Sequence, residues 1–181
     1  YIILTIICFI SYYYFGMSVF DSITHSFSTI STGGFSTHDN SFAYFQDNRI
    51  LLISMLFMLI GSFPFIILAQ ISLKKPLILF QDQQVRLFIM IIISLIASLY
   101  LLVGDQISSS ISQKIITISF NSISIITGTG FVSDNFEQWG NYSSILFLFI
   151  MFIGGCAGST TGGLKIFLSS IITSTNNFSV S

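Results

Sequence analysis

The chain has 181 residues, of which 52% are hydrophobic and only 7% are charged, and its formal net charge is −1. A typical soluble domain carries about 25% charged residues, so this composition excludes an ordinary soluble protein and indicates a chain that lies in lipid. The slightly negative charge also argues against a nucleic acid as the partner.

Four apolar runs follow one another along the chain. They cover residues 1–15, 50–71, 85–103 and 142–153, and the last run resumes at 164–173 after a glycine-rich interruption. A bilayer span takes ~20 residues, and we expect the second run to cross as one helix kinked at Gly61 and Pro64. The first run begins at Tyr1 without an initiator Met, so we expect the cut end of a membrane helix in a longer protein.

Basic residues orient these spans. Lys74, Lys75 and Arg86 follow the second run closely and make up half of the six Lys and Arg residues. The positive-inside rule therefore makes the linker 74–84 cytoplasmic. The two flanking units, residues 1–73 and 85–181, then both enter from the cytoplasm and return to it, which predicts two parallel repeats.

Each unit contains a short segment rich in Ser and Thr on the opposite side of the membrane. We predict pore helices at about 20–31 and 111–126. Residues 20–30 would extend about 16 Å at ~1.5 Å per residue, roughly half of a ~30 Å core, so each segment dips in and returns. A shift of 96 positions aligns the two dips. It pairs Ser26 with Ser122, Ser28 with Ser124, Ile30 with Ile126, Gly34 with Gly130 and Phe35 with Phe131.

The stretch after each predicted pore helix has the composition of a cation filter. Residues 31–37 are STGGFST, and residues 127–133 are TGTGFVS. A filter replaces the hydration shell of the ion with backbone carbonyl oxygens, and glycine adopts the unusual dihedrals that this needs. The negative C-terminal end of a pore helix favours a cation. We predict filters at 32–36 and 127–132, with the ion bound at Thr32, Gly33, Gly34, Phe35, Thr127, Gly128, Thr129, Gly130 and Phe131.

A glycine-rich stretch interrupts the last apolar run. A continuous helix over 142–173 would be about 48 Å long at ~1.5 Å per residue, which exceeds the ~30 Å core. Non-helical backbone at membrane depth lines a cavity or is covered by protein, so we predict an intramembrane gating loop at 154–163. The residues expected to form it are Gly154, Gly155, Gly158, Ser159, Thr160, Gly162 and Gly163. Lys165 beside it repels cations at a gate, holds freed carbonyls, or snorkels to the cytoplasmic interface.

The remaining polar residues form no reactive set. His25 lies one turn after Asp21 on the first pore helix, where we expect a polar contact near the outer surface. Cys8 and Cys156 are interpreted as small buried residues. No Ser/His/Asp or Cys/His arrangement is credible, so we expect no enzyme activity and no cofactor.

Three stretches resemble one known family, the TrkH potassium-uptake proteins of the TrkH/KtrB/HKT superfamily. Residues 25–39 (HSFSTISTGGFSTHD) resemble its second pore loop, and residues 127–134 (TGTGFVSD) resemble its third. Residues 152–165 (FIGGCAGSTTGGLK) resemble the intramembrane loop of the third repeat. Together the matches imply a piece that covers the second and third of four repeats.

The resemblance implies a fold and a function. The fold is an all-α integral membrane protein with two helix–re-entrant pore loop–helix repeats, half of a four-repeat channel-like pore. The function is potassium uptake across the inner (plasma) membrane of a bacterial-type cell. The filter glycines of the family correspond to Gly34 and Gly130, potassium is the only metal ion implied, and the gate corresponds to 154–163 with Lys165 nearby. The family also implies a homodimer and a cytoplasmic nucleotide-binding regulatory subunit.

Two other functions stay open. A secondary transporter for another small solute would use the glycine loop as a discontinuous-helix binding site. A membrane scaffold would tolerate bulky residues in the glycine segments. The repeated Gly-Phe dips favour the potassium pore over both.

Overall fold

The computed structural model describes residues 1–45, 47–72, 78–104 and 110–163. Within these ranges the fold is all-helical and contains no strand, as the apolar runs predict. The α-helices are α1 (Ile2–Tyr14), α2 (Val19–Ile30), α3 (Asn48–Ser62), α4 (Phe65–Ser72), α5 (Ile78–Gln81), α6 (Gln83–Val103), α7 (Ile111–Ile126) and α8 (Asn141–Ile150). Two 3-10 helices, η1 (Ser41–Tyr44) and η3 (Phe136–Trp139), lie in the loops after α2 and α7.

The second apolar run is two helices, so the expectation of one kinked helix is wrong. α3 ends at Ser62 and α4 begins at Phe65. Pro64 has no backbone N–H and cannot continue the helical ladder. Phe63 before it is extended, with φ −86° and ψ 154°, as a residue before proline prefers. The break leaves the last carbonyls of α3 without helical partners.

α2 and α7 end alike but begin differently. Their C-caps, Ser31 (φ −80°, ψ −4°) and Thr127 (φ −76°, ψ −10°), lie 96 positions apart. Their N-caps, Ser18 and Ser110, lie 92 positions apart, because α7 has 16 residues and α2 has 12. Each N-cap hydroxyl accepts a hydrogen bond from the N–H three residues later. The two short helices are therefore in register at the ends that lead into the glycine turns.

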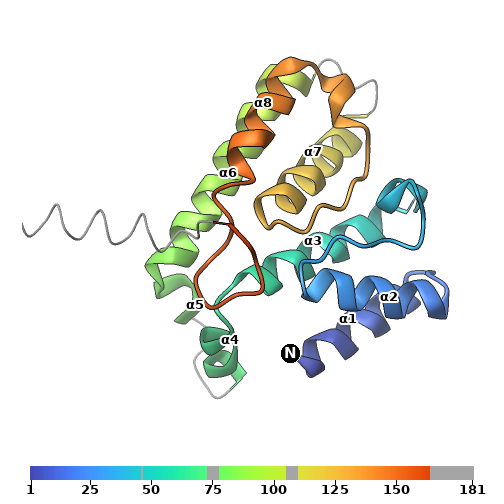
Figure 1. Ribbon diagram of the computed structural model, residues 1–181, viewed down its shortest axis with the longest axis vertical. Helices are drawn as coiled ribbons and strands as arrows, with labels where there is room; N and C mark the ends of the chain where they lie inside the picture. Colours follow the sequence, from blue (N-terminus) through green and yellow to red (C-terminus); the bar gives the residue numbers. More distant parts are fainter. Residues whose placement is uncertain (46, 73–77, 105–109, 164–181) are drawn as a thin grey trace, which may run out of the picture.

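α3 crosses the middle of the molecule (Figure 1). It joins a first half, made of α1, α2 and η1, to a second half, made of α6, α7 and α8. It packs against α2 in the first half and against α7 in the second, while α6 and α8 flank α7. The aromatic ring of Phe42, in η1, lies between the halves. Its centroid is 5.2 Å from that of His25, 5.3 Å from that of Phe120 and 4.4 Å from that of Phe131. A buried aromatic cluster thus holds the two halves together.

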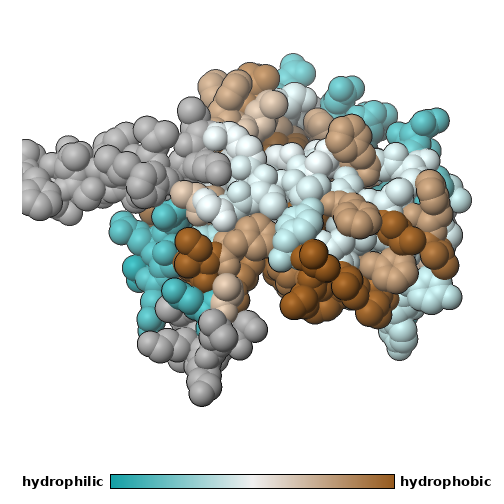
Figure 2. Space-filling model, turned by 60° about the horizontal axis from the view of Figure 1, so that its bottom comes forward, coloured by the Kyte–Doolittle hydropathy of each residue, from teal (hydrophilic) through white to brown (hydrophobic). Residues whose placement is uncertain are grey.

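Much of the surface is apolar. Ile2 and Ile3 of α1 are each 73% exposed, and Leu101 of α6 is 79% exposed. Figure 2 shows brown apolar groups across one face, with hydrophilic groups mainly at its edges. Within the described ranges one helix, α6, is long and apolar enough to cross a membrane. Apolar patches of this extent fit contact with lipid or with other protein rather than with water.

Candidate functional site

The turns after α2 and α7 share an unusual backbone. Thr32 (φ 51°) and Gly34 (φ 73°) are left-handed in the first turn, and Gly128 (φ 68°) and Gly130 (φ 82°) are left-handed at the same repeat positions in the second. In each turn a residue without positive φ separates the two. A carbonyl-lined cation site needs successive carbonyls on one side of the chain, which takes unusual backbone dihedrals that glycine adopts readily.

The two turns touch each other. A Cβ built on Gly34 would overlap the carbonyl oxygen of Thr129 and would lie 3.0 Å from its carbonyl carbon. The Thr129 carbonyl therefore faces the first turn across almost no space. Gly130, the repeat partner of Gly34, has no such neighbour: nothing described lies within 4 Å of its Cβ position.

Two phenylalanines at equivalent repeat positions have opposite environments. Phe131 is 1% exposed and packs on Phe42 of the first half. Phe35 is 81% exposed. The second turn thus buries Phe131 against the first half. The equivalent Phe35 of the first turn is covered by no described part of the chain.

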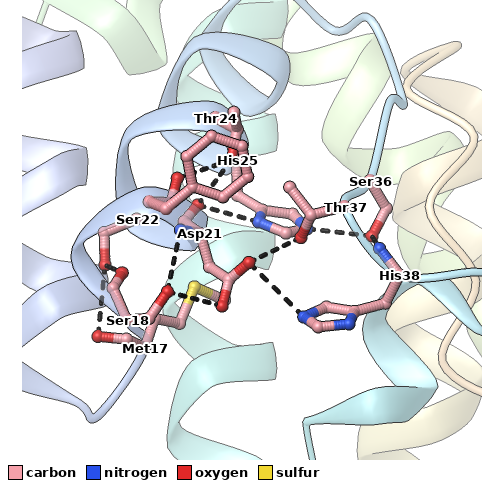
Figure 3. Close-up of polar contacts among 10 residues, drawn as sticks. Met17, Ser18, Asp21, Ser22, Thr24, His25, Ser36, Thr37 and His38 are labelled. Carbon is pink, nitrogen blue, oxygen red and sulfur yellow. Dashed lines mark hydrogen bonds and ion pairs between the residues drawn. The ribbon is translucent and has the colours of Figure 1, made fainter.

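A polar network holds the chain that follows the first turn against α2 (Figure 3). The Asp21 carboxylate accepts a hydrogen bond from Thr37 Oγ1 at 2.6 Å and one from Ser18 Oγ at 2.7 Å. His38 Nε2 lies 3.4 Å from Asp21 Oδ1, a distance that suits an ion pair better than an aligned hydrogen bond. Partial burial raises the pKa of Asp21, but the hydrogen bonds from Thr37 and Ser18 and the charge of His38 outweigh it and leave the pKa below its usual value.

His25 makes the polar contact expected of it, and its ring is fully buried. Nδ1 lies 2.8 Å from the carbonyl oxygen of Asp21, which can only accept, so Nδ1 carries the proton of the neutral ring. Nε2 then accepts the hydroxyl of Ser36 at 3.0 Å. The same Ser36 oxygen accepts the backbone N–H of His38 at 3.2 Å, as Figure 3 shows.

Asn121 occupies the matching position on α7, although no motif in the sequence marked it as a site residue. Its Nδ2 donates to the carbonyl of Thr117 and to Ser133 Oγ, both at 3.0 Å. Its Oδ1 accepts the backbone N–H of Ser133 at 3.2 Å. The 96-position shift that pairs His25 with Asn121 was the available signal, although the two side chains differ in type.

The glycine-rich segment 154–163 closes on itself. A Cβ on Gly154 would overlap the carbonyl oxygen of Gly162, and a Cβ on Gly163 would lie 3.0 Å from Gly154 Cα. The Thr161 hydroxyl accepts the backbone N–H of Gly155 at 3.2 Å and lies 2.7 Å from Ser159 Oγ. Glycine is required where Gly154 meets Gly162 and Gly163, because the two ends of the loop pass there with their backbones in contact.

The loop formed by 154–163 satisfies the backbone groups that the break between α3 and α4 leaves free. The N–H of Cys156 donates to the carbonyl of Ser62 and that of Thr160 to the carbonyl of Gly61, both at 3.2 Å, and the N–H of Phe65 donates to the carbonyl of Gly158 at 3.0 Å. Two irregular segments thus pair with each other, as lipid surroundings require. Gln84 adds a bond from Ala157 N–H to its Oε1 at 3.0 Å, a contact that no sequence pattern indicated.

The same loop contacts both glycine turns. Thr32 Oγ1 donates to the carbonyl of Thr160 at 3.1 Å, and Thr160 Oγ1 lies 3.0 Å from the carbonyl of Ile30 at the end of α2. On the other side, the Cβ position of Gly128 is 3.9 Å from the backbone nitrogen of Gly162. The structure therefore brings together the two turns and the loop that the sequence singled out.

Some of the predicted residues lie outside the described ranges. They are Lys165 and the linker residues Lys74 and Lys75. Within the described ranges no group of three or more His, Cys, Asp and Glu side chains is placed to hold a metal ion. The polar groups at the site are instead backbone carbonyls and Thr and Ser hydroxyls, the kinds of oxygen that line cation filters.

A family model decides the membership of the chain. The TrkH model, described as cation transport protein, matches residues 1–179. The chain belongs to the TrkH family. This makes it an integral membrane protein, in agreement with its apolar surface.

Several TrkH-family relatives are similar over most of the chain. The Trk system potassium uptake protein TrkI of Halomonas elongata is 34% identical over 90% of the chain and 33% of its own length. TrkH of Vibrio parahaemolyticus is 39% identical and TrkH of Escherichia coli 38%, each over 92% of the chain and 35% of the relative. The crystal structure of the potassium transporter TrkH from Vibrio parahaemolyticus superposes with a TM-score of 0.88 at 38% identity, covering 94% of this chain and 37% of that one. The chain thus spans about a third of the length of these TrkH-family relatives.

Proposed function

We propose that the protein containing this chain carries potassium inward across the inner (plasma) membrane of a bacterial cell. Residues 32–36 and 127–132 would supply two quarters of a carbonyl filter. The observation that carries the proposal is the contact between Gly34 and the Thr129 carbonyl, which joins two turns of matching left-handed backbone. The relatives named as potassium uptake proteins support the choice of ion.

The contacts of residues 154–163 support a gating role for them. The loop bonds to the ends of α2 and α3 and reaches both turns, so its position and that of the filter depend on each other. Opening it would separate the backbone groups of Cys156, Gly158 and Thr160 from their partners. An unpaired buried backbone group costs about 1–3 kcal/mol, so the loop is held closed until water or a rearrangement supplies new partners.

Further repeats would complete the pore, and the exposure of Phe35 supports this. The homodimer and the cytoplasmic nucleotide-binding regulatory subunit rest on the family resemblance. Co-purification of the full-length protein with such a subunit, and its mass in detergent, would test both.

The pore is tested by two matched substitutions in the full-length protein. Gly34→Ala adds a Cβ that overlaps the Thr129 carbonyl at a left-handed residue, whereas the nearest described atom to a Cβ at Gly104 is Tyr100 Cδ2, at 3.8 Å. In liposomes we expect potassium flux to fall at least about tenfold in the first, given ~1–2 kcal/mol for left-handed backbone alone, and to persist in the second. Equal flux in both variants would count against the filter. Saturable uptake of an organic solute would point instead to a secondary transporter.

A further inference from the structure

We propose that His25 and Asn121 are positioning residues that hold the two filter turns in the conformation that selects potassium over sodium. The inference rests on the proposed function and extends it from the turns to the side chains behind them. Neither residue touches the pathway that we propose. Each residue acts on its filter turn through the backbone segment that follows the turn, at Ser36 or Ser133.

The two side chains make the same pair of connections in both halves. Each bonds to the carbonyl one helical turn earlier, Asp21 for His25 and Thr117 for Asn121, and these carbonyls are also 96 positions apart. Each also bonds to a serine hydroxyl just after the glycine turn, Ser36 or Ser133. The serine lies one residue later in the second half, where the Asn121 amide also accepts the Ser133 N–H. Two different side chains thus meet one geometric requirement.

The bond to the helical carbonyl fixes the direction of each side chain. In His25 it leaves Nε2 aimed at the segment after the turn, and in Asn121 the same Nδ2 reaches that segment; both atoms lie 3.0 Å from the serine hydroxyl. Both side chains are fully buried, whereas the serines that they reach are half-buried, so water is excluded from the His25 and Asn121 ends of these bonds. The turn is then fixed at both ends: by the cap of the pore helix before it and by the serine after it.

The position of His25 also links the two halves. Its ring lies 6.0 Å from that of Phe131, which follows Gly130 in the second turn. A shift of the ring would therefore disturb the Ser36 end of the first turn and the aromatic neighbour of the second together. A filter discriminates ions of similar size by small differences in carbonyl position, so we expect selectivity to respond before overall flux does.

Ion selectivity separates positioning from a merely structural role. The full-length protein is reconstituted in liposomes, and potassium and sodium fluxes are measured for His25→Leu, His25→Asn and Asn121→Leu. Since one buried hydrogen bond is worth about a few- to tenfold in an equilibrium, we expect the potassium-to-sodium ratio to fall up to about tenfold in both Leu variants. His25→Asn installs the side chain of the other half and should keep the ratio within about twofold of the unsubstituted protein.

Two further variants keep the test decisive. Ser36→Ala removes the partner at the half-buried end of the bond, so it should lower the ratio even if His25→Leu does not fold. Ser22→Ala is the control, because it removes a serine hydroxyl that is buried on α2 and bonds to the carbonyls of Met17 and Ser18 rather than to the segment after the turn. It should leave the ratio unchanged.

The outcomes distinguish the two proposals. An unsubstituted protein that carries no potassium overturns the proposed function and the positioning role with it. A selective protein whose ratio survives His25→Leu and Ser36→Ala overturns the positioning role alone. A ratio lowered as much by Ser22→Ala as by Ser36→Ala also overturns it, since general loosening of α2 would then be the cause.

Discussion

The glycines within 154–163 differ in how much space surrounds them. A Cβ on Gly155 would lie 2.6 Å from Thr161 Oγ1 and 2.8 Å from Thr161 Cγ2, and Thr161 is buried. A Cβ on Gly162 would meet nothing described within 4 Å. Neither residue has a positive φ, so close packing rather than backbone strain separates them. The sequence predicted a glycine loop, but not which of its glycines are crowded.

Gly155→Ala should therefore destabilise the loop, and Gly162→Ala should not. The first displaces the Thr161 side chain, which also loses its bond to the Gly155 N–H. Overpacking of this kind costs about 1–3 kcal/mol. Thermal unfolding of the purified protein in detergent measures the difference. The same unfolding midpoint for both variants would show that Gly155 and Thr161 are not closely packed.

The Asp21 network predicts a dependence on acidic pH. Its pKa is lowered in the folded protein, so its contribution to stability is complete above the pKa of about 3.9 of an unfolded aspartate and is lost as pH falls through the lower folded value. Asp21→Asn removes this contribution. We expect the variant to be less stable than the unsubstituted protein near neutral pH, with the difference shrinking below about pH 4. Unfolding midpoints across pH measure it, and a constant difference down to strong acid would contradict it.

At the scale of elements, the structure pairs two interruptions of regular helix. Pro64 ends α3, and the freed groups of residues 61–65 bond to residues 156–160. Hydropathy predicted the helices because burial in lipid selects apolar runs, and Pro64 indicated a disturbance in α3. The partnership was not predictable, since its bonds join positions nearly 100 residues apart and follow no local pattern.

Thr160 connects the loop to the ends of both α2 and α3. Its hydroxyl lies 3.0 Å from the carbonyls of Ile30 and Gly61 and has one proton to share between them. Thr160→Val should loosen the closed loop by about 1 kcal/mol and raise basal potassium flux about fivefold, whereas Thr160→Ser keeps the hydroxyl and should behave like the unsubstituted protein. Flux into potassium-free liposomes measures both. A Val variant with unchanged basal flux would argue against the loop as a gate.

At the scale of the whole molecule, the two halves contact each other unequally. The second turn packs Phe131 on the first half, while Phe35 stays exposed. The likeness of the two turns was visible in the sequence, because a shift of 96 positions matches residues of both, and their helix C-caps are also 96 positions apart. Which of the two phenylalanines is buried was not predictable, since both turns carry the same Gly-Phe pair.

In the full-length protein we expect Phe35→Ala to cost as much stability as Phe131→Ala. Loss of a buried phenylalanine side chain costs about 3–5 kcal/mol, so both midpoints should fall well below that of the unsubstituted protein. If Phe35 remained as exposed as it is here, only Phe131→Ala would matter. Thermal unfolding of the two variants side by side distinguishes a closed ring from an open one.

The contact between Gly34 and Thr129 restricts which residues the two turns can carry. The obstacle to a larger residue at 34 is a main-chain oxygen, which no exchange of side chain at 129 removes. A genetic screen for second-site revertants of Gly34→Ala should therefore return few changes at Thr129 itself. Compensation would have to come from residues that shift the whole turn after α7, so we expect the two turns to change together.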